Sequence, residues 1–231
     1  MEGIMDNSQQ AVALIKFFSE EEHYLAFKAG YSFFRTPHYF RRREDLGRGD
    51  RSESCLGYWD RKLGDLMPNI VSNGQPIDLE NAESVLVYPA HEQKDAWLQS
   101  WCMIGPHNEF EQSLERMLEE FGAYFAILPA RSISTYASLI GQASGEPVRY
   151  GLIKYSDNPL DRSSTIKDHG FSYQKEFRFY VGECDKSEEK DRNIRLNGVT
   201  NLLLEAGSLR FESSSGLVKY CFQGQKKVVF A

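Results

Sequence analysis

The sequence has few cysteines, and their spacing supports neither a disulfide framework nor a zinc site. No C-x-x-C pair occurs among the four of them, which are Cys55, Cys102, Cys184 and Cys221. The five histidines form no i, i+4 pair, and none stands near a cysteine at zinc-ligand spacing. We therefore expect free thiols and assign no structural zinc.

The sequence also lacks a hydrophobic run long enough to cross a membrane. The apolar stretch Ala11–Phe18 is too short for a membrane span or for the core of a secretion signal, and residues 1–10 are polar and acidic. We therefore expect a cytoplasmic protein that does not contact a membrane.

Positive charge is in deficit, since the formal net charge is −6. This balance argues against a broad basic surface for duplex nucleic acid. A local basic groove stays open, because one short stretch contains Arg35, Arg41, Arg42, Arg43, Arg48 and Arg51. The other interpretation is a solvated loop in which Glu44, Asp45 and Asp50 offset those charges.

Two common catalytic motifs are missing. No G-x-x-x-x-G-K-[ST] phosphate loop occurs, and Gly141–Gly145 does not fit the G-x-S-x-G turn around a nucleophilic serine. The sequence therefore gives no support for a P-loop nucleotide hydrolase or a serine hydrolase.

The chain of 231 residues has no repeat or low-complexity tract, so we expect one domain over residues 1–231. Stretches typical of mobile loops are 41–54, 69–81 and 184–193. Helices are expected at 19–29, 110–121 and 132–140. Strands are expected at 11–18, 31–35, 85–88, 95–104, 124–128 and 148–155, and then at 171–183, 194–204, 207–213, 216–222 and 226–230. This distribution predicts an α+β fold rather than regular βαβ winding.

Local signals mark the ends of two expected helices. Ser19 and Glu22 are spaced as a capping box, and Gly30 suits the left-handed residue after a helix. An apolar stripe at helical spacing ends at Gly122 and consists of Phe110, Leu114, Met117, Leu118 and Phe121.

The segment Phe171–Val181 is the most informative stretch of the sequence. Read as a strand, it places nearly all its apolar residues on one face, and on the other Ser172, Gln174, Glu176, Arg178 and Tyr180. This second face is either a cleft, with Glu176 acting on a substrate and Arg178 holding its geometry, or an ordinary solvent-exposed sheet face with an ion pair.

Ser100 lies in a strand between Trp97 and Trp101. One interpretation is a core serine that bonds to the backbone, which agrees with the apolar residues on its face. The other places it at a pocket wall, where tryptophan is available to stack on a flat ring.

Two parts of the sequence together resemble a large group of uncharacterised bacterial and phage proteins. The opening has an aliphatic strand ending in Lys-aromatic, Ile15–Phe18, then a helix, then an aromatic strand that runs into a Pro-x-x-Phe turn, Tyr31–Arg41. The later part has Lys167 upstream of an aromatic-x-x-Glu-aromatic-Arg pattern at residues 173–178.

The strand–helix–strand opening and the late glutamate also resemble the ADP-ribosyltransferase superfamily, including toxins of the DarT type. The resemblance implies a split, mostly antiparallel β core with flanking helices that cradles NAD. It places Lys16 on the first strand, where arginine or histidine is usual. Ser100 becomes the candidate on the middle strand, without the usual Ser-x-Ser, and Glu176 becomes the catalytic residue.

The same resemblance implies residues that bind NAD as a substrate. The candidates for pairing with the pyrophosphate are Arg35 and Arg178, whose guanidinium groups each offer two aligned donors, and Lys167. The candidates for stacking on the nicotinamide are Tyr31, Phe34 and Tyr39. A carboxylate near the ribose would stabilise the oxocarbenium-like state in which the nicotinamide–ribose bond breaks.

These residues lead to the hypothesis of a toxin or phage-defence effector that transfers ADP-ribose from NAD to an RNA, DNA or protein acceptor. An antitoxin or inhibitor protein is a candidate partner. One alternative is a Mg²⁺-dependent nuclease that uses Asp161 and Glu176, because Pro159–Asp161 followed by Glu176–Arg178 resembles the Pro-Asp…Glu-x-Lys pattern of restriction-type nucleases. The other alternative is a non-catalytic binding or inhibitor protein whose aromatic surfaces form an interface.

Overall fold

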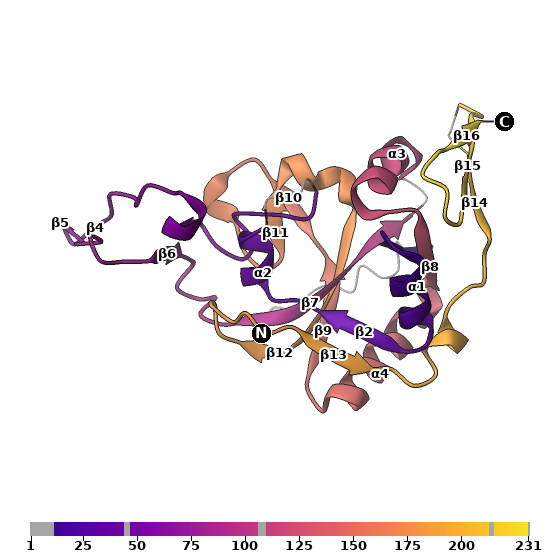
Figure 1. The fold of residues 1–231 in the computed structure, drawn as a ribbon, viewed down its shortest axis with the longest axis horizontal. Coiled ribbons are helices and arrows are strands. Elements are labelled where there is room, and N and C mark those ends of the chain that lie inside the picture. Colours follow the sequence, from indigo (N-terminus) through magenta and orange to yellow (C-terminus); the bar gives the residue numbers. More distant parts are fainter. Residues whose placement is uncertain (1–11, 44–46, 106–109, 213–214, 231) are drawn as a thin grey trace.

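A five-stranded antiparallel sheet forms the centre of the molecule (Figure 1). The computed structural model describes residues 12–43, 47–105, 110–212 and 215–230, and shows a single α+β fold. In spatial order the central strands are β8 (Tyr124–Pro129), β1 (Ala13–Phe18), β7 (Asp95–Ile104), β12 (Glu176–Cys184) and β9 (Val148–Leu152). Residues 1–11, Glu44, Asp45, Ser213 and the side chain of Phe110, all used in the sequence predictions, lie outside the described part.

Helices cover both faces of this sheet. On one face, helices α1 (Glu21–Lys28) and α4 (Ile133–Ser144) contribute Phe27 and Tyr136 to a core that includes Trp101, Phe177 and Phe179. On the other face, helix α3 (Phe110–Phe121) packs Leu114 and Leu118 against β1 and β8. The short helix α2 (Pro37–Arg41) lies near the far end of β7.

Smaller elements surround the central sheet. The two-stranded pairs are β2 (Tyr31–Phe34) with β13 (Arg192–Arg195), β3 (Gly57–Asp60) with β6 (Ser84–Val87), β4 (Val71–Ser72) with β5 (Gln75–Pro76), and the parallel pair β10 (Lys154–Ser156) with β11 (Ile166–Asp168). A C-terminal sheet contains β14 (Ser208–Glu212), β15 (Val218–Phe222) and β16 (Val229–Phe230). The β4–β5 hairpin projects away from the body of the molecule (Figure 1). The 3₁₀ helices are η2 (Arg61–Leu63), η3 (Ala130–Ser132), η4 (Pro159–Asp161), η5 (His169–Gln174) and η6 (Val199–Leu202).

Strands β1 and β7 form a fork. They pair only from Ala13 opposite Ile104 to Ile15 opposite Cys102. Beyond that point β1 continues along β8 to Phe18, whereas β7 continues along β12. The two strands therefore separate, and a stretch of β7 loses its backbone partner on one side.

The predicted strand–helix–strand opening is confirmed by β1, α1 and β2. The capping box is wrong, because helix α1 has Glu20 as its N-cap residue, without a side-chain hydrogen bond. Gly30 has the expected positive φ of 96°. Gly122 has φ of 106°, and a Cβ atom there would lie 2.2 Å from the carbonyl oxygen of Phe18, so two constraints require glycine.

The predicted strand 171–183 is wrong in its first part. Residues His169–Gln174 form η5, which begins where the Asp168 carboxylate accepts a hydrogen bond from the Gly170 backbone at 2.8 Å. Lys175 then takes a left-handed conformation with φ of 45°, and the strand starts only at Glu176. The predicted strand 194–204 is likewise only partly correct, because β13 ends at Arg195 and η6 follows.

Two of the predicted loops are tied to the interior by charged residues. Arg41 is fully buried and donates to the carbonyl oxygen of Glu53 and to Asp95. Lys186 is also buried, and its Nζ lies 2.7 Å from the Asp95 carboxylate. Charged runs that suggest solvated loops thus contain buried ion pairs, whereas the 69–81 stretch is mostly exposed.

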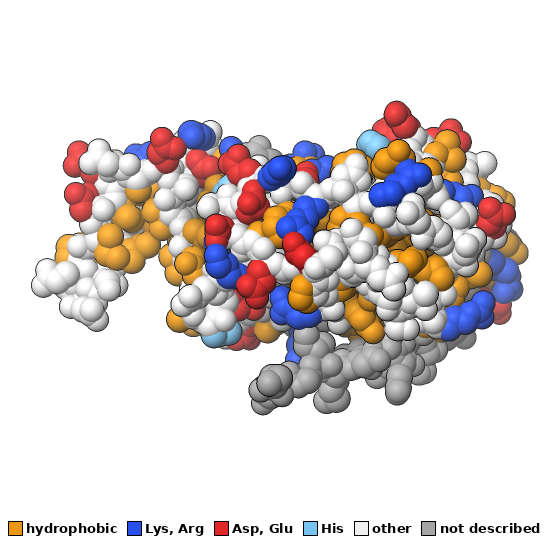
Figure 2. All heavy atoms as spheres, turned by 90° about the horizontal axis from the view of Figure 1, so that it is seen from below, with side chains coloured by type: hydrophobic (Ala, Val, Ile, Leu, Met, Phe, Trp, Pro, Cys, Tyr) orange, Lys and Arg blue, Asp and Glu red, His pale blue; other side chains and the backbone are white. Residues whose placement is uncertain are grey.

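The surface charges are mixed. On the face shown in Figure 2, acidic and basic side chains are interspersed among the described residues, without a large patch of one sign. The arginine-rich stretch is divided among separate ion pairs, in which Arg35 binds Asp191, Arg42 binds Glu189 and Arg51 binds Asp65. No helix in the described part of the chain is long and apolar enough to span a membrane.

Candidate functional site

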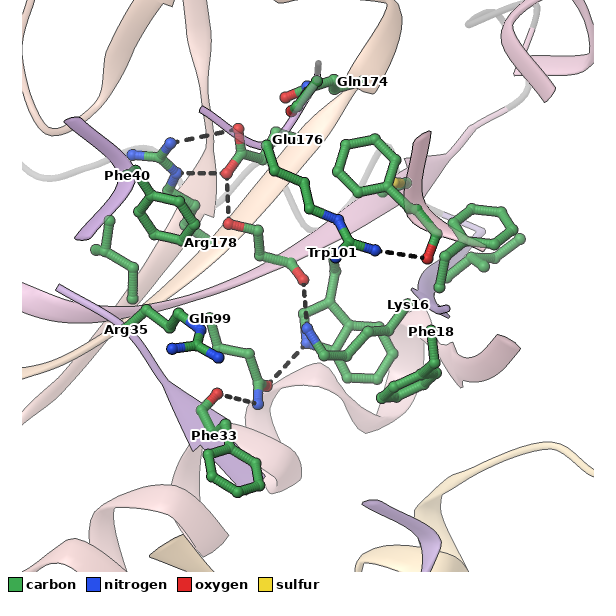
Figure 3. Close-up of a pocket in the computed structure, with 18 of the residues that line it drawn as sticks. Lys16, Phe18, Phe33, Arg35, Phe40, Gln99, Trp101, Gln174, Glu176 and Arg178 are labelled. Atoms are coloured by element: carbon green, nitrogen blue, oxygen red, sulfur yellow. Dashed lines mark hydrogen bonds and ion pairs between the residues drawn. The ribbon is translucent and has the colours of Figure 1, made fainter. Parts of the chain in front are cut away.

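A cavity of about 480 Å³ opens where β1 and β7 separate. Its lining comes from β1, α1, β2, α2, the segment around residues 47–53, β7, α3, β11, η5 and β12. This volume falls within the range of about 300–1,000 Å³ typical of sites for small molecules and cofactors. The cavity therefore has the size of a binding site, and Figure 3 shows the charged and aromatic side chains that line it.

Glu176 lies in this cavity at the start of β12, and its side chain is almost completely buried. One carboxylate oxygen, Oε1, accepts hydrogen bonds from Ser100 Oγ at 2.5 Å and from Arg178 Nε at 2.6 Å. The other, Oε2, accepts from Lys167 Nζ at 3.1 Å and from Arg178 Nη2 at 3.4 Å. The strand alternation predicted for Glu176, Arg178 and Tyr180 is correct, but their face is buried instead of exposed to solvent.

The charges around Glu176 keep it ionised. Burial opposes ionisation, but the charges of Arg178 and Lys167 outweigh burial and hold the pKa of Glu176 well below its ordinary value. At neutral pH the group is therefore a fixed negative charge, suited to electrostatic stabilisation and not to donating a proton.

A second carboxylate, Glu53, holds Arg178 in place from the opposite side. Its two oxygens accept from Arg178 Nη1 and Nη2, both at 2.6 Å, in a bidentate pair that is almost completely buried. Lys167 Nζ lies 3.9 Å from both Glu53 and Asp50. Three carboxylates and two cations thus form one buried network, which we call the Glu176 network (Asp50, Glu53, Lys167, Glu176 and Arg178).

Lys16 reaches the cavity from β1. Its Nζ donates to the backbone carbonyl oxygen of Ser100 at 3.0 Å, in the part of β7 that has lost its strand partner. The ammonium group also lies about 6 Å from the ring centroids of Phe18 and Trp101. Ser100 therefore links Lys16 to Glu176, through its carbonyl group on one side and its hydroxyl group on the other.

Aromatic side chains form much of the cavity wall. Tyr31 and Phe33 lie on the exposed face of β2, and both contribute to the lining. The guanidinium carbon of Arg35 lies over the ring of Tyr39, 4.1 Å from the ring centroid. A planar ligand could therefore stack near the mouth of the cavity.

The structure brings the predicted site residues together. The cavity is lined by all eight candidates for catalysis and NAD binding: Lys16, Tyr31, Arg35, Tyr39, Ser100, Lys167, Glu176 and Arg178. Ser100 lies at the wall of the cavity, as the second interpretation of its position predicted, and its hydroxyl group donates to Glu176. Phe34, however, is fully buried in the core, and its neighbour Phe33 lines the cavity instead.

The residues of the nuclease alternative do not come together in the structure. Asp161, the partner of Glu176 in the nuclease interpretation, does not line the cavity and instead accepts hydrogen bonds from Ser156 and Asn158. Within the described part of the chain, no group of three or more His, Cys, Asp or Glu residues is placed to hold a metal ion. Glu53 also lines the cavity, and sequence reasoning missed it because it stands in a charged stretch with no regular pattern. Arg48, which lines the cavity too, was named only as one member of a possible basic groove.

The chain matches no protein-family model, and comparisons with curated proteins and with solved structures find no match.

Asp50 provides a test of the charge balance in the Glu176 network. Burial and then the neighbouring Glu53 carboxylate raise the pKa of Asp50 to about 6. The pKa of Asp50 in the folded protein exceeds its ordinary value near 3.9. The unfolding free energy therefore decreases as the pH rises from about 4 to about 6, and above pH 6 it stays lower by the full cost of ionising the buried carboxyl group. We expect Asp50→Asn to stabilise the protein by roughly 1–3 kcal/mol at pH 7 and not below about pH 4.

Urea unfolding at pH 4 and pH 7 measures this difference. Asp78→Asn is the control, because Asp78 is exposed and its replacement should change stability by less than about 0.5 kcal/mol. If Asp50→Asn raised the unfolding free energy equally at both pH values, ionisation of the Asp50 carboxyl group would not destabilise the folded protein.

Proposed function

We propose that this protein is an ADP-ribosyltransferase that uses NAD as a substrate and acts on a macromolecular acceptor. The observation that carries the proposal is the connection of Lys16, Ser100 and Glu176 across β1, β7 and β12, neighbouring strands of one sheet, at the wall of the cavity. These are the three positions that the family resemblance singles out. Their sequence separations of 84 and 76 residues mean that only the fold brings them together.

The fork between β1 and β7 supports the same proposal. The resemblance implies a split β core that cradles NAD, and here the cavity lies where the two strands part. The exposed aromatic residues of β2 at its wall suit the nicotinamide or adenine ring, and the cations suit the pyrophosphate.

The ionised state of Glu176 fits the chemistry. When the nicotinamide–ribose bond breaks, positive charge develops on the ribose, and a nearby carboxylate stabilises it. Because Ser100, Lys167 and Arg178 already occupy both oxygens, a ribose hydroxyl group would have to replace one of these donors. Ser100 is the donor most suited to exchange, since it is neutral and only half-buried.

Incubation of the protein with NAD labelled in the adenylate part, in the presence of cell lysate, tests the proposal. We expect released nicotinamide together with label on RNA, DNA or protein, which would also identify the class of acceptor. If neither nicotinamide nor labelled product forms, the proposed function is wrong. Cleavage of nucleic acid that needs Mg²⁺ but not NAD would instead support the nuclease alternative.

A further inference from the structure

The cations that line the cavity differ in whether a carboxylate neutralises them. Arg178 binds Glu53 and Glu176, Lys167 binds Glu176, and Arg35 binds Asp191. These are the three residues that the family resemblance offered for the pyrophosphate. Each already has an acidic partner, so none of them supplies uncompensated positive charge to a ligand.

Lys16 and Arg48 are different. Among the described residues, their side-chain donors reach only backbone carbonyl oxygens, at 3.0 Å to Ser100 and 3.2 Å to Phe121, and neither cation has a carboxylate within ion-pair distance. Both side chains line the cavity, and burial, together with the positive charges of Arg48 and Arg35, lowers the pKa of Lys16. Two partly buried positive charges without a counter-ion are costly, and an anionic ligand would offset that cost.

The surroundings of this pair indicate what kind of anion fits. Lys16 lies beside the rings of Phe18 and Trp101, and Arg48 lies 6.0 Å from the ring centroid of Phe121. A ligand with a flat ring as well as negative charge would use both features. The volume of about 480 Å³ accommodates a small nucleotide.

We propose that Lys16 and Arg48 form a subsite for the diphosphate group of a nucleotide. As the pyrophosphate subsite for NAD, it rests on the proposed function and replaces the assignment to Arg35, Lys167 and Arg178. Binding of ADP or inorganic pyrophosphate can nevertheless be measured without any turnover.

Isothermal titration calorimetry of the full chain with pyrophosphate, ADP and adenosine tests the subsite. We expect Lys16→Met and Arg48→Met each to weaken pyrophosphate and ADP binding by roughly ten-fold or more, because each removes one charge-assisted contact. Lys28→Met is the matched control, because Lys28 pairs with Glu205 outside the cavity, and it should bind like the wild type. Lys16→Arg keeps the charge and should restore most of the affinity lost in Lys16→Met, which separates a binding role from a folding defect.

A second measurement follows the proton on Lys16. Burial lowers the pKa of Lys16 to about 8, and the titratable groups facing it are the Cys102 thiol on β7, the Glu176 carboxylate on β12, Arg48, and Arg35 after β2. An anion favours the protonated ammonium, so binding near pH 8 should take up protons, detected as a dependence of the heat on the buffer. Lys16→Met should abolish this uptake.

Several results would overturn the subsite. They are no binding of pyrophosphate or ADP by the wild type, equal affinities for adenosine and ADP, no proton uptake near pH 8, or wild-type affinity in both Met variants. The two proposals also fail separately. If diphosphate binding depends on Lys16 and Arg48 but no nicotinamide is released, the subsite is supported and the transferase proposal is wrong. If nicotinamide is released and both variants have an unchanged KM for NAD, the transferase is supported and the subsite is wrong.

Discussion

We expect Glu176→Gln to lower the rate of the proposed nicotinamide release by about 10²–10³-fold, the loss typical of removing one preorganised electrostatic contact to a transition state. Glutamine has nearly the same shape and can still accept the hydrogen bond from Ser100, but it carries no charge. The loss should therefore fall on kcat more than on KM, because in the proposed mechanism the carboxylate stabilises charge that appears only as the bond breaks. Steady-state assays of nicotinamide release measure both constants.

Glu183→Gln is the control for this prediction. Glu183 lies on the same strand, β12, but its side chain is exposed and does not line the cavity. It should retain wild-type rates. A Glu176→Gln protein that folds and releases nicotinamide within a few-fold of wild type would exclude Glu176 as the catalytic residue.

We expect Glu53→Ala to destabilise the protein by about 3–5 kcal/mol, because it leaves the buried Arg178 without its bidentate partner. The effect should appear as a lower midpoint in urea unfolding at pH 7. The double variant Glu53→Leu with Arg178→Met removes both charges, and its loss of stability should be much smaller than the sum of the losses in the Glu53→Leu and Arg178→Met single variants.

Glu205→Ala is the control for stability. Glu205 pairs with Lys28 at 3.3 Å, but it is largely exposed, so the loss should be under about 1 kcal/mol. Additive losses in the double variant would mean that Glu53 and Arg178 are not energetically coupled, and that the Glu176 network does not act as one unit.

Much of the fold could be predicted from local patterns. The alternation of residues 95–104 predicted β7, and the helical spacing of Leu114, Met117 and Leu118 predicted α3. The strand prediction was wrong at residues 171–175 because Phe171 and Tyr173 alternate with polar residues as in a strand. The same alternation is compatible with the 3₁₀ helix η5, which Asp168 caps.

The candidate site could be predicted only in part. Glu176 and Arg178 stand out because they are charged residues within an aromatic strand, and Lys16 and Ser100 followed from family resemblance. Glu53 lies 125 residues from Arg178, so no local pattern connects them. Its burial depends on which loop the fold places over β12, and this is decided by tertiary packing.

Strand β12 carries the aromatic core on one side and the Glu176 network on the other. If the chain aligned β12 wrongly by one residue, Phe177 and Phe179 would turn toward the charges, and Glu176 and Arg178 would enter the apolar core. Such a misaligned state would contain unpaired buried ions, so it would be strongly disfavoured during folding. The charged residues of the Glu176 network therefore also favour the correct register of β12 when the central strands pair.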